Sequence, residues 1–210
     1  MSPEDQGFMA RALRLAENGK YSTHPNPCVG CVLVRQGNVV GEGFHLLAGQ
    51  GHAEANALAD AGTDAREPVA YVTLEPCSFH GRTPSCARAL IDAGVSKVVV
   101  AMLDPDARNA GKGVLILREA GIEVVTPFMQ EAAQGLVRGH VSRHTKQRPL
   151  VRLKLAMTLD GKTSLSNGES RWITSVEARA DVQKLRARSA AIGTGVQTVI
   201  DDDPRLSVGG

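Results

Sequence analysis

The stretch Val-Ala-Tyr-Val-Thr-Leu-Glu-Pro-Cys, residues 69–77, joins an apolar run to a short polar motif. Residues 69–74 are mostly apolar, which is typical of a buried β-strand. Glu75-Pro76-Cys77 follows the predicted strand directly. The stretch therefore places a cysteine at the end of a core strand.

Alternating strand and helix patterns extend from this strand in both directions. A β-hairpin is predicted upstream, with strands at residues 28–35 and 39–44 joined by Gln36-Gly37-Asn38. Further strands are predicted at residues 97–102 and 122–125, and helices at residues 3–20, 52–62, 84–93, 112–120 and 129–146. One hairpin followed by strand–helix alternation predicts a three-layer α/β/α domain over residues 1–146, in which the later strands lie parallel.

A second predicted domain begins at residue 149, after a boundary near Gln147-Arg148-Pro149. Residues 150–157 and 190–194 are predicted to be strands, and residues 175–188 a helix. About 60 residues are too few to close a hydrophobic core unaided. Residues 149–210 are therefore expected to be the N-terminal fragment of a longer α/β domain.

The composition is that of an ordinary globular protein, with 42% hydrophobic and 22% charged residues. Aromatic residues make up only 3%, so the core is expected to be aliphatic. A net charge of +2 does not indicate the concentrated basic face that nucleic-acid binding needs. The basic stretch 138–148 is interpreted as a solvated helix face. No apolar run suits a membrane span and the N-terminus does not resemble a signal peptide, so the expected location is cytoplasmic.

Four residues form a candidate zinc site. His52 and Glu54 lie where a glycine-containing loop meets a predicted helix, Cys77 follows a strand, and Cys86 starts the next helix. Catalytic zinc takes three protein ligands and keeps one position for water, which His52, Cys77 and Cys86 would provide for one Zn²⁺ per chain. Glu54 would then carry protons between the water and a leaving nitrogen. His-x-Glu followed by Pro-Cys and a second Cys is the signature of zinc deaminases.

The loop between the two cysteines is longer than the signature requires. Eight residues separate Cys77 from Cys86, where two are usual. The loop contains His80 and Arg82 and must cross the mouth of the pocket, so we expect these two residues to contact the substrate.

The motifs together resemble the bifunctional riboflavin-biosynthesis deaminase/reductase family. The resemblance is carried by Pro25-Asn26-Pro27, Val29-Gly30-Cys31, His52-Ala53-Glu54, Glu75-Pro76-Cys77 and Gly81-Arg82-Thr83-Pro84, and by residues 154–162, 170–174 and 202–206. It implies a cytidine-deaminase-like domain followed by the start of a dihydrofolate-reductase-like domain. The implied reaction is deamination of 2,5-diamino-6-ribosylamino-4(3H)-pyrimidinone 5′-phosphate, followed in the full-length family by NADPH-dependent reduction of the ribosyl group. The truncated second domain is expected not to complete that reduction.

The resemblance also implies roles for residues outside the zinc site. Asn26 and His45 would contact the deaminase substrate. The implied NADPH contacts are Ala156, Trp172, Thr198 and Asp202. The implied contacts to the reductase substrate are Ser170, Arg186 and Leu206. The partners expected on this basis are a small-molecule pyrimidine ribosyl phosphate and further copies of the chain, with neither nucleic acid nor membrane.

Two other interpretations stay open. A nucleic-acid adenosine or cytidine deaminase would share the signature, but should keep the short cysteine spacing and a basic surface. A structural-zinc interaction module would need four ligands, and Cys28 and Cys31 could in principle join the set. The apolar sequence around Cys28 and Cys31 favours burial instead.

Overall fold

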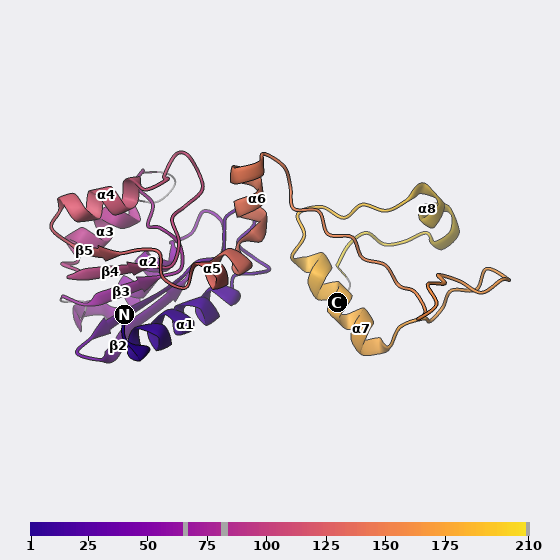
Figure 1. Cartoon of the computed structure of the whole chain (residues 1–210), viewed down its shortest axis with the longest axis horizontal. Helices are drawn as coiled ribbons and strands as arrows, with labels where there is room; N and C mark the ends of the chain where they lie inside the picture. Colours follow the sequence, from indigo (N-terminus) through magenta and orange to yellow (C-terminus); the bar gives the residue numbers. More distant parts are fainter. Residues whose placement is uncertain (65–66, 81–83, 209–210) are drawn as a thin grey trace. The chain divides into compact units, whose positions relative to one another are not determined.

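The computed structural model describes residues 1–64, 67–80 and 84–208 (Figure 1). The chain divides into two compact units, Met1–Leu150 and Val151–Gly210. Among the described residues, no helix combines the length and the apolar character needed to cross a bilayer.

The first unit is built on one mixed sheet of five strands in the order β2-β1-β3-β4-β5. The strands are β1 (Gly30–Arg35), β2 (Asn38–Phe44), β3 (Val69–Val72), β4 (Lys97–Val100) and β5 (Glu123–Val125). Strand β1 pairs antiparallel with β2 and β3, whereas β3, β4 and β5 run parallel. The predicted hairpin and the predicted parallel arrangement of the later strands are both confirmed.

Helices cover both faces of this sheet, and Figure 1 shows α3 and α4 on one side and α1 on the other. The helices are α1 (Pro3–Glu17), α2 (Ala53–Ala61), α3 (Cys86–Asp92), α4 (Lys112–Glu119), α5 (Gln130–Leu136) and α6 (Arg138–Lys146), and a short 3-10 turn, η1 (Gly62–Asp64), follows α2. Alternate strand residues face opposite cores, as in Val98 and Val99 of β4. The predicted three-layer α/β/α fold is confirmed.

Two glycines of β2 allow α2 to pack unusually close to the sheet. A Cβ atom at Gly43 would lie 2.3 Å from the carbonyl oxygen of Ala53, and one at Gly41 would lie 2.4 Å from that of Ala57. Both distances are far below normal contact, so the helix backbone occupies the space that side chains would need. This contact fixes the position of the N-terminal end of α2.

The prediction of one helix over residues 129–146 is wrong. The helix is interrupted at Val137, where φ is −111° and ψ is 31°, and α5 and α6 lie on either side. The buried side chain of Val137 packs in the core beneath α1 and α5. Gly135 and Gly139 flank it, and glycine and β-branched residues weaken a helix at this point.

The second unit contains helices α7 (Val176–Ala187) and α8 (Val196–Asp202), and its described residues contain no strand. The predicted strands at residues 150–157 and 190–194 are therefore wrong. A strand needs a neighbour for its backbone groups, and the described part of this unit offers none, so Val151 and Leu153 stay more than four-fifths exposed. The predicted helix at residues 175–188 is confirmed as α7, whose cap Ser175 accepts a hydrogen bond from the Ala178 N–H.

Helix α8 was not predicted. Val199 and Ile200 lie three and four positions after Val196, and this apolar spacing is typical of a helix.

The contact of α2 with β2 predicts the effect of one substitution. Gly43→Ala should lower the free energy of unfolding by about 1–3 kcal/mol, because its Cβ atom would overlap the Ala53 and Ala57 backbone. The control is Gly139→Ala in α6, where an added Cβ atom has no atom from outside the helix within 4 Å. This substitution should raise the free energy of unfolding by about 0.5–1 kcal/mol, because alanine favours a helix over glycine. Urea unfolding of both variants measures the difference, and equal stabilities would contradict the proposed packing.

Candidate metal centre

Three side chains meet at one end of the sheet in the first unit. The ligating atoms of His52, Cys77 and Cys86 all lie within 4.8 Å of one another. The Nδ1 atom of His52 is 3.2 Å from the Cys86 sulfur and 3.7 Å from the Cys77 sulfur. Ligands of a tetrahedral zinc with normal bond lengths stand about 3.5 Å apart. The three residues therefore fit a zinc ion without rearrangement of the backbone.

Two helix starts and one strand end bring these ligands together. His52 directly precedes α2, Cys86 is the first residue of α3, and Cys77 lies in the loop that follows β3. The Cys86 N–H donates to the Cys77 sulfur at 3.2 Å, and the Ala87 N–H donates to the Cys77 carbonyl oxygen at 3.2 Å. The positive end of α3 thus points at Cys77, which favours its thiolate form.

The two thiols titrate as a pair. A hydrogen bond from Cys86 lowers the pKa of Cys77 to about 4, with smaller help from His52, while burial opposes the shift. The same hydrogen bond, with burial, raises the pKa of Cys86 far above its usual range. A hydrogen bond with Cys77 raises the pKa of His52, and burial opposes this shift. A divalent cation would displace protons from the side chains that bind it.

Glu54 lies beside this cluster in the first turn of α2. Its side chain is buried, with 3% exposed, and burial raises its pKa to about 7. A carboxyl group with a pKa near neutrality can both accept and return a proton. Its position two residues after His52 therefore suits proton transfer next to the cluster.

Asn26 and His45 lie next to the same cluster. The His45 ring packs edge-on against the His52 ring, with centroids 5.2 Å apart. His45 Nδ1 is 3.1 Å from the Gly51 carbonyl oxygen, which can only accept, so Nδ1 carries the proton. His45 Nε2 then accepts from Asn26 Nδ2 at 3.0 Å, and burial lowers the pKa of His45, which keeps the ring neutral.

The loop between the two cysteines is described only in part. His80 is exposed, and its neighbour Phe79 lies under the guanidinium of Arg108, with 5.3 Å to the ring centroid. Arg82, for which we predicted substrate contact, lies outside the described residues.

Several residues predicted for the second site contact other residues of the second unit, which were not themselves predicted. Trp172 stacks under Arg179 at 4.2 Å, and the adjacent Arg171 pairs with Asp202 at 3.4 Å. Arg186 donates to the carbonyl oxygens of Arg205 and Ser207, at 2.6 and 2.8 Å, which lie on both sides of Leu206. Of the three other predicted residues, one is half-buried and two are exposed, namely Ala156, Ser170 and Thr198.

The other two cysteines do not complete a four-ligand site. Cys31 belongs to the core beneath α2, α3 and α4, whereas Cys28 belongs to the core beneath α1 and α5. They lie on opposite faces of the sheet and cannot bind one ion together. Within the part of the chain that the structure describes, the cluster of His52, Cys77 and Cys86 is the one group that could hold a metal.

Two polar side chains beside Cys77 were missed by the sequence reasoning. Ser85 Oγ donates to the Cys77 carbonyl oxygen at 2.8 Å, and Asn109 Oδ1 accepts from the Ser78 N–H at 2.9 Å. Ser85 could have been identified as the cap of α3, because Ser is a preferred cap residue. Asn109 lies 31 positions from Ser78, and no local pattern links the two.

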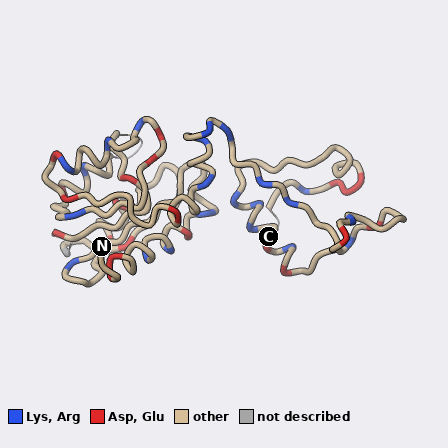
Figure 2. The backbone as a smooth tube through the Cα atoms, viewed as in Figure 1, with Lys and Arg blue, Asp and Glu red and all other residues tan. Residues whose placement is uncertain are grey.

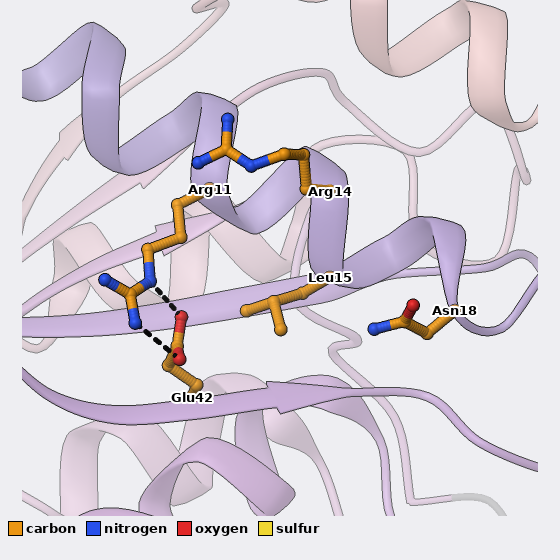
Figure 3. A pocket seen from close by; sticks show the side chains of 5 residues that line it. All are labelled: Arg11, Arg14, Leu15, Asn18 and Glu42. Carbon is orange, nitrogen blue, oxygen red and sulfur yellow. Dashed lines mark hydrogen bonds and ion pairs between the residues drawn. The ribbon is translucent and has the colours of Figure 1, made fainter.

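An open pocket between α1 and β2 lies on a different part of the first unit (Figure 3). Arg11 and Glu42 form a bidentate ion pair across it, and Arg14, Leu15 and Asn18 line the rest. The lining of this pocket includes none of the three candidate ligands, so the pocket is separate from the candidate metal centre.

Comparisons with known proteins bear on both units. The family described as the cytidine and deoxycytidylate deaminase zinc-binding region matches residues 2–102, which include all three candidate ligands. The family described as the RibD C-terminal domain matches residues 149–210.

Individual relatives match almost the whole chain. The riboflavin biosynthesis protein RibD of Haemophilus influenzae is 54% identical over 99% of this chain, and that of Escherichia coli is 53% identical over 98%. The chain spans 56% of each of these relatives, so it corresponds to about half of their length.

Two solved structures are similar over nearly the same range. Acinetobacter baumannii RibD has a TM-score of 0.94 at 53% identity, and the match covers 98% of this chain and 58% of that one. A diaminohydroxyphosphoribosylaminopyrimidine deaminase/5-amino-6-(5-phosphoribosylamino)uracil reductase from Thermotoga maritima has a TM-score of 0.92 at 40% identity, with coverage of 98% and 59%.

The geometry of the cluster predicts the effect of removing one ligand. Cys86→Ser should lose bound zinc, because a hydroxyl is a far weaker zinc ligand than a thiolate. Elemental analysis of the purified protein measures the metal directly, and Cys28→Ser, which removes a thiol from the other face of the sheet, should keep one zinc per chain. Full zinc retention in the Cys86 variant would rule out Cys86 as a ligand.

Proposed function

The chain belongs to the RibD family of riboflavin-biosynthesis proteins, and from this membership we propose that its first unit is a zinc-dependent deaminase. The proposed substrate is 2,5-diamino-6-ribosylamino-4(3H)-pyrimidinone 5′-phosphate, which water converts to 5-amino-6-ribosylaminouracil 5′-phosphate and ammonia. The observation that carries the proposal is a cluster of one imidazole and two thiol groups, with a buried carboxyl group beside it.

His52, Cys77 and Cys86 would hold one zinc ion and leave a fourth position for the reacting water. Zinc bound there would acidify that water and orient it towards the ring. Two thiolates cancel the charge of Zn²⁺, so they leave the ion a weaker acid than three imidazoles would. A separate proton acceptor is needed for that reason.

Glu54 supplies the acceptor. Its carboxylate takes a proton from the water as the water oxygen bonds to ring carbon 2. The carboxyl group passes that proton to ring nitrogen 1, then takes the remaining hydroxyl proton and gives it to the exocyclic nitrogen, so that the carbon–nitrogen bond breaks and ammonia leaves. The oxygen remains as the new carbonyl of the product. A pKa of about 7 lets one residue serve both transfers at neutral pH.

Asn26 and His45 would orient the pyrimidine ring. The proton on His45 Nδ1 fixes Nε2 as an acceptor, which in turn fixes the Asn26 amide with Nδ2 towards His45. The Asn26 Oδ1 atom is then the group offered to N–H donors of the ring. His80 and Arg82, from the loop between the cysteines, would contact the polar ribosyl phosphate.

The second unit is proposed to begin a dihydrofolate-reductase-like domain that uses NADPH in the longer relatives. The NADPH contacts would be Ala156, Trp172, Thr198 and Asp202. The contacts to the ribosyl product would be Ser170, Arg186 and Leu206. Support comes from the match of residues 149–210 and from the ion pair of Asp202 with the residue before Trp172.

A nucleic-acid deaminase is the main competing function. Figure 2 shows Lys and Arg interspersed with Asp and Glu over the first unit, and a basic run on α6 and the residues after it. That run includes His140 and His144, which pair with Asp104 and Asp106. The net charge of only +2 and the eight-residue spacing between Cys77 and Cys86 favour a small-molecule substrate over nucleic acid. The proposal extends to a cytoplasmic homo-oligomer, whose size sedimentation would measure.

Ammonia release tests the proposed substrate. The zinc-loaded protein should release one ammonia per molecule of the diaminopyrimidine phosphate, with a matching change in ultraviolet absorbance. Deoxycytidylate and an adenosine-containing tRNA hairpin are the comparison substrates and should react at least ~100-fold more slowly, since a site built to pair with a polar group rejects ligands that lack it. Preferred deamination of either comparison substrate would overturn the assignment.

A substitution at Glu54 separates metal binding from proton transfer. Glu54→Gln should keep one zinc per chain and lower the rate of ammonia release by about 10²–10⁴-fold, because the amide cannot carry the proton. Zinc content and turnover are measured on the same preparation. Near-normal turnover would show that another group moves the protons.

A further inference from the structure

Glu75 is buried directly before the Pro76-Cys77 pair, and its carboxylate accepts four backbone hydrogen bonds. The N–H groups of Asp104 and Gly111 donate to Oε2 at 3.0 and 2.9 Å. Those of Gly113 and Val114 donate to Oε1 at 2.9 and 3.2 Å. Each oxygen is therefore matched by two donors, and the buried charge is satisfied without a cationic side chain.

These donors come from both ends of one loop. Asp104 lies shortly after β4, whereas Gly111 caps α4 and the next two donors lie in its first turn. The first N–H groups of a helix have no partner inside the helix, so the carboxylate satisfies them and also complements the helix dipole. Glu75 N–H donates in turn to the Met102 carbonyl oxygen at 3.0 Å. Glu75 thereby holds the loop over residues 104–111 against the end of β3.

Asn109 lies in that loop and is fully buried. Its Oδ1 atom accepts from the Ser78 N–H at 2.9 Å. Its Nδ2 atom donates to the Pro76 carbonyl oxygen at 3.3 Å and lies 3.5 Å from that of Glu75. One side-chain amide therefore holds the backbone on both sides of Cys77.

Helix α4 adds a direct contact to the same peptide. A Cβ atom at Gly113 would lie 1.9 Å from the Pro76 carbonyl oxygen. The helix backbone thus rests on the Pro76 peptide, and only glycine leaves room for it. The loop that carries Asn109 cannot move away from Cys77 without also moving this helix.

We propose that Asn109, held in place by Glu75, is a positioning residue that presents Cys77 to the metal. The proposal rests on the zinc site proposed above. Asn109 and Glu75 act through the backbone of residues 75–78 and do not bind the metal. Cys77 lies outside any helix or strand, so its backbone needs such external partners to keep one conformation. A ligand fixed before binding loses less conformational freedom when the ion arrives.

The test compares zinc affinity in variants of the full chain. Asn109→Ala should raise the zinc dissociation constant, measured by competition with a chromophoric chelator, by about 10–100-fold, as is usual when a partner of a metal ligand is removed. The sulfur-to-metal charge-transfer band of the Co²⁺-substituted protein should also shift. The matched control is Ser96→Ala, which removes a side-chain donor to the Glu67 and Pro68 carbonyl oxygens at the opposite end of β3. It should leave both readouts unchanged.

The possible results separate this inference from the proposed function. Failure of the unsubstituted chain to bind zinc would overturn the zinc site and, with it, the inference. Normal zinc binding by the unsubstituted chain, with equal affinity in Asn109→Ala, would overturn the positioning role alone. A loss of zinc affinity in Ser96→Ala equal to that in Asn109→Ala would also overturn the positioning role alone.

A second variant covers the case in which Asn109→Ala does not fold. Asn109→Asp keeps the acceptor for the Ser78 N–H and loses the donors, so its zinc affinity should also fall. If neither variant folds while Ser96→Ala does, Asn109 serves stability and the positioning role is wrong.

Discussion

The close contact of α2 with β2 is the constraint on which the rest of the site depends. Gly41 and Gly43 have no side chains, and the α2 backbone fills the space beside them. Because that distance is fixed, the residues at the start of α2, His52 and Glu54, have fixed positions relative to the sheet. The strand pairing then sets where the loop with Cys77 meets them. A looser helix would leave the same four chemical groups without a common centre.

The arrangement also solves an electrostatic problem. Two thiol groups, an imidazole and a carboxyl group lie together, buried or half-buried, and burial alone would disfavour their charged forms. Hydrogen bonds from the Cys86 side chain and from its N–H at the start of α3 lower the pKa of Cys77. A bound cation would stabilise the charged forms more strongly. The same residues, whose charged forms are disfavoured by burial, would therefore be complementary to a metal ion. Glu54 lies outside the group of three candidate ligands, and burial raises its pKa to about 7.

The sequence was informative where one pattern carried one meaning. The strand at residues 69–74 and the later parallel strands follow from apolar periodicity, and the His-Ala-Glu and Pro-Cys motifs contain candidate ligands that the fold brings together. The strands predicted after residue 149 failed because a strand depends on partners that local sequence does not reveal. The break at Val137 was not predicted, although glycines flank it. The contact of Asn109 with the backbone around Cys77 was not predicted either, because it joins residues 31 positions apart.

The most direct test of the account is the coordination shell of bound zinc, measured by X-ray absorption at the zinc edge. Two sulfur neighbours at about 2.3 Å and two nitrogen or oxygen neighbours at about 2.0–2.1 Å are expected, the latter from His52 and one exchangeable water. Addition of the deaminated product should change only the oxygen neighbour. A shell of four protein ligands with no exchangeable oxygen, or a shell without sulfur, would contradict the account.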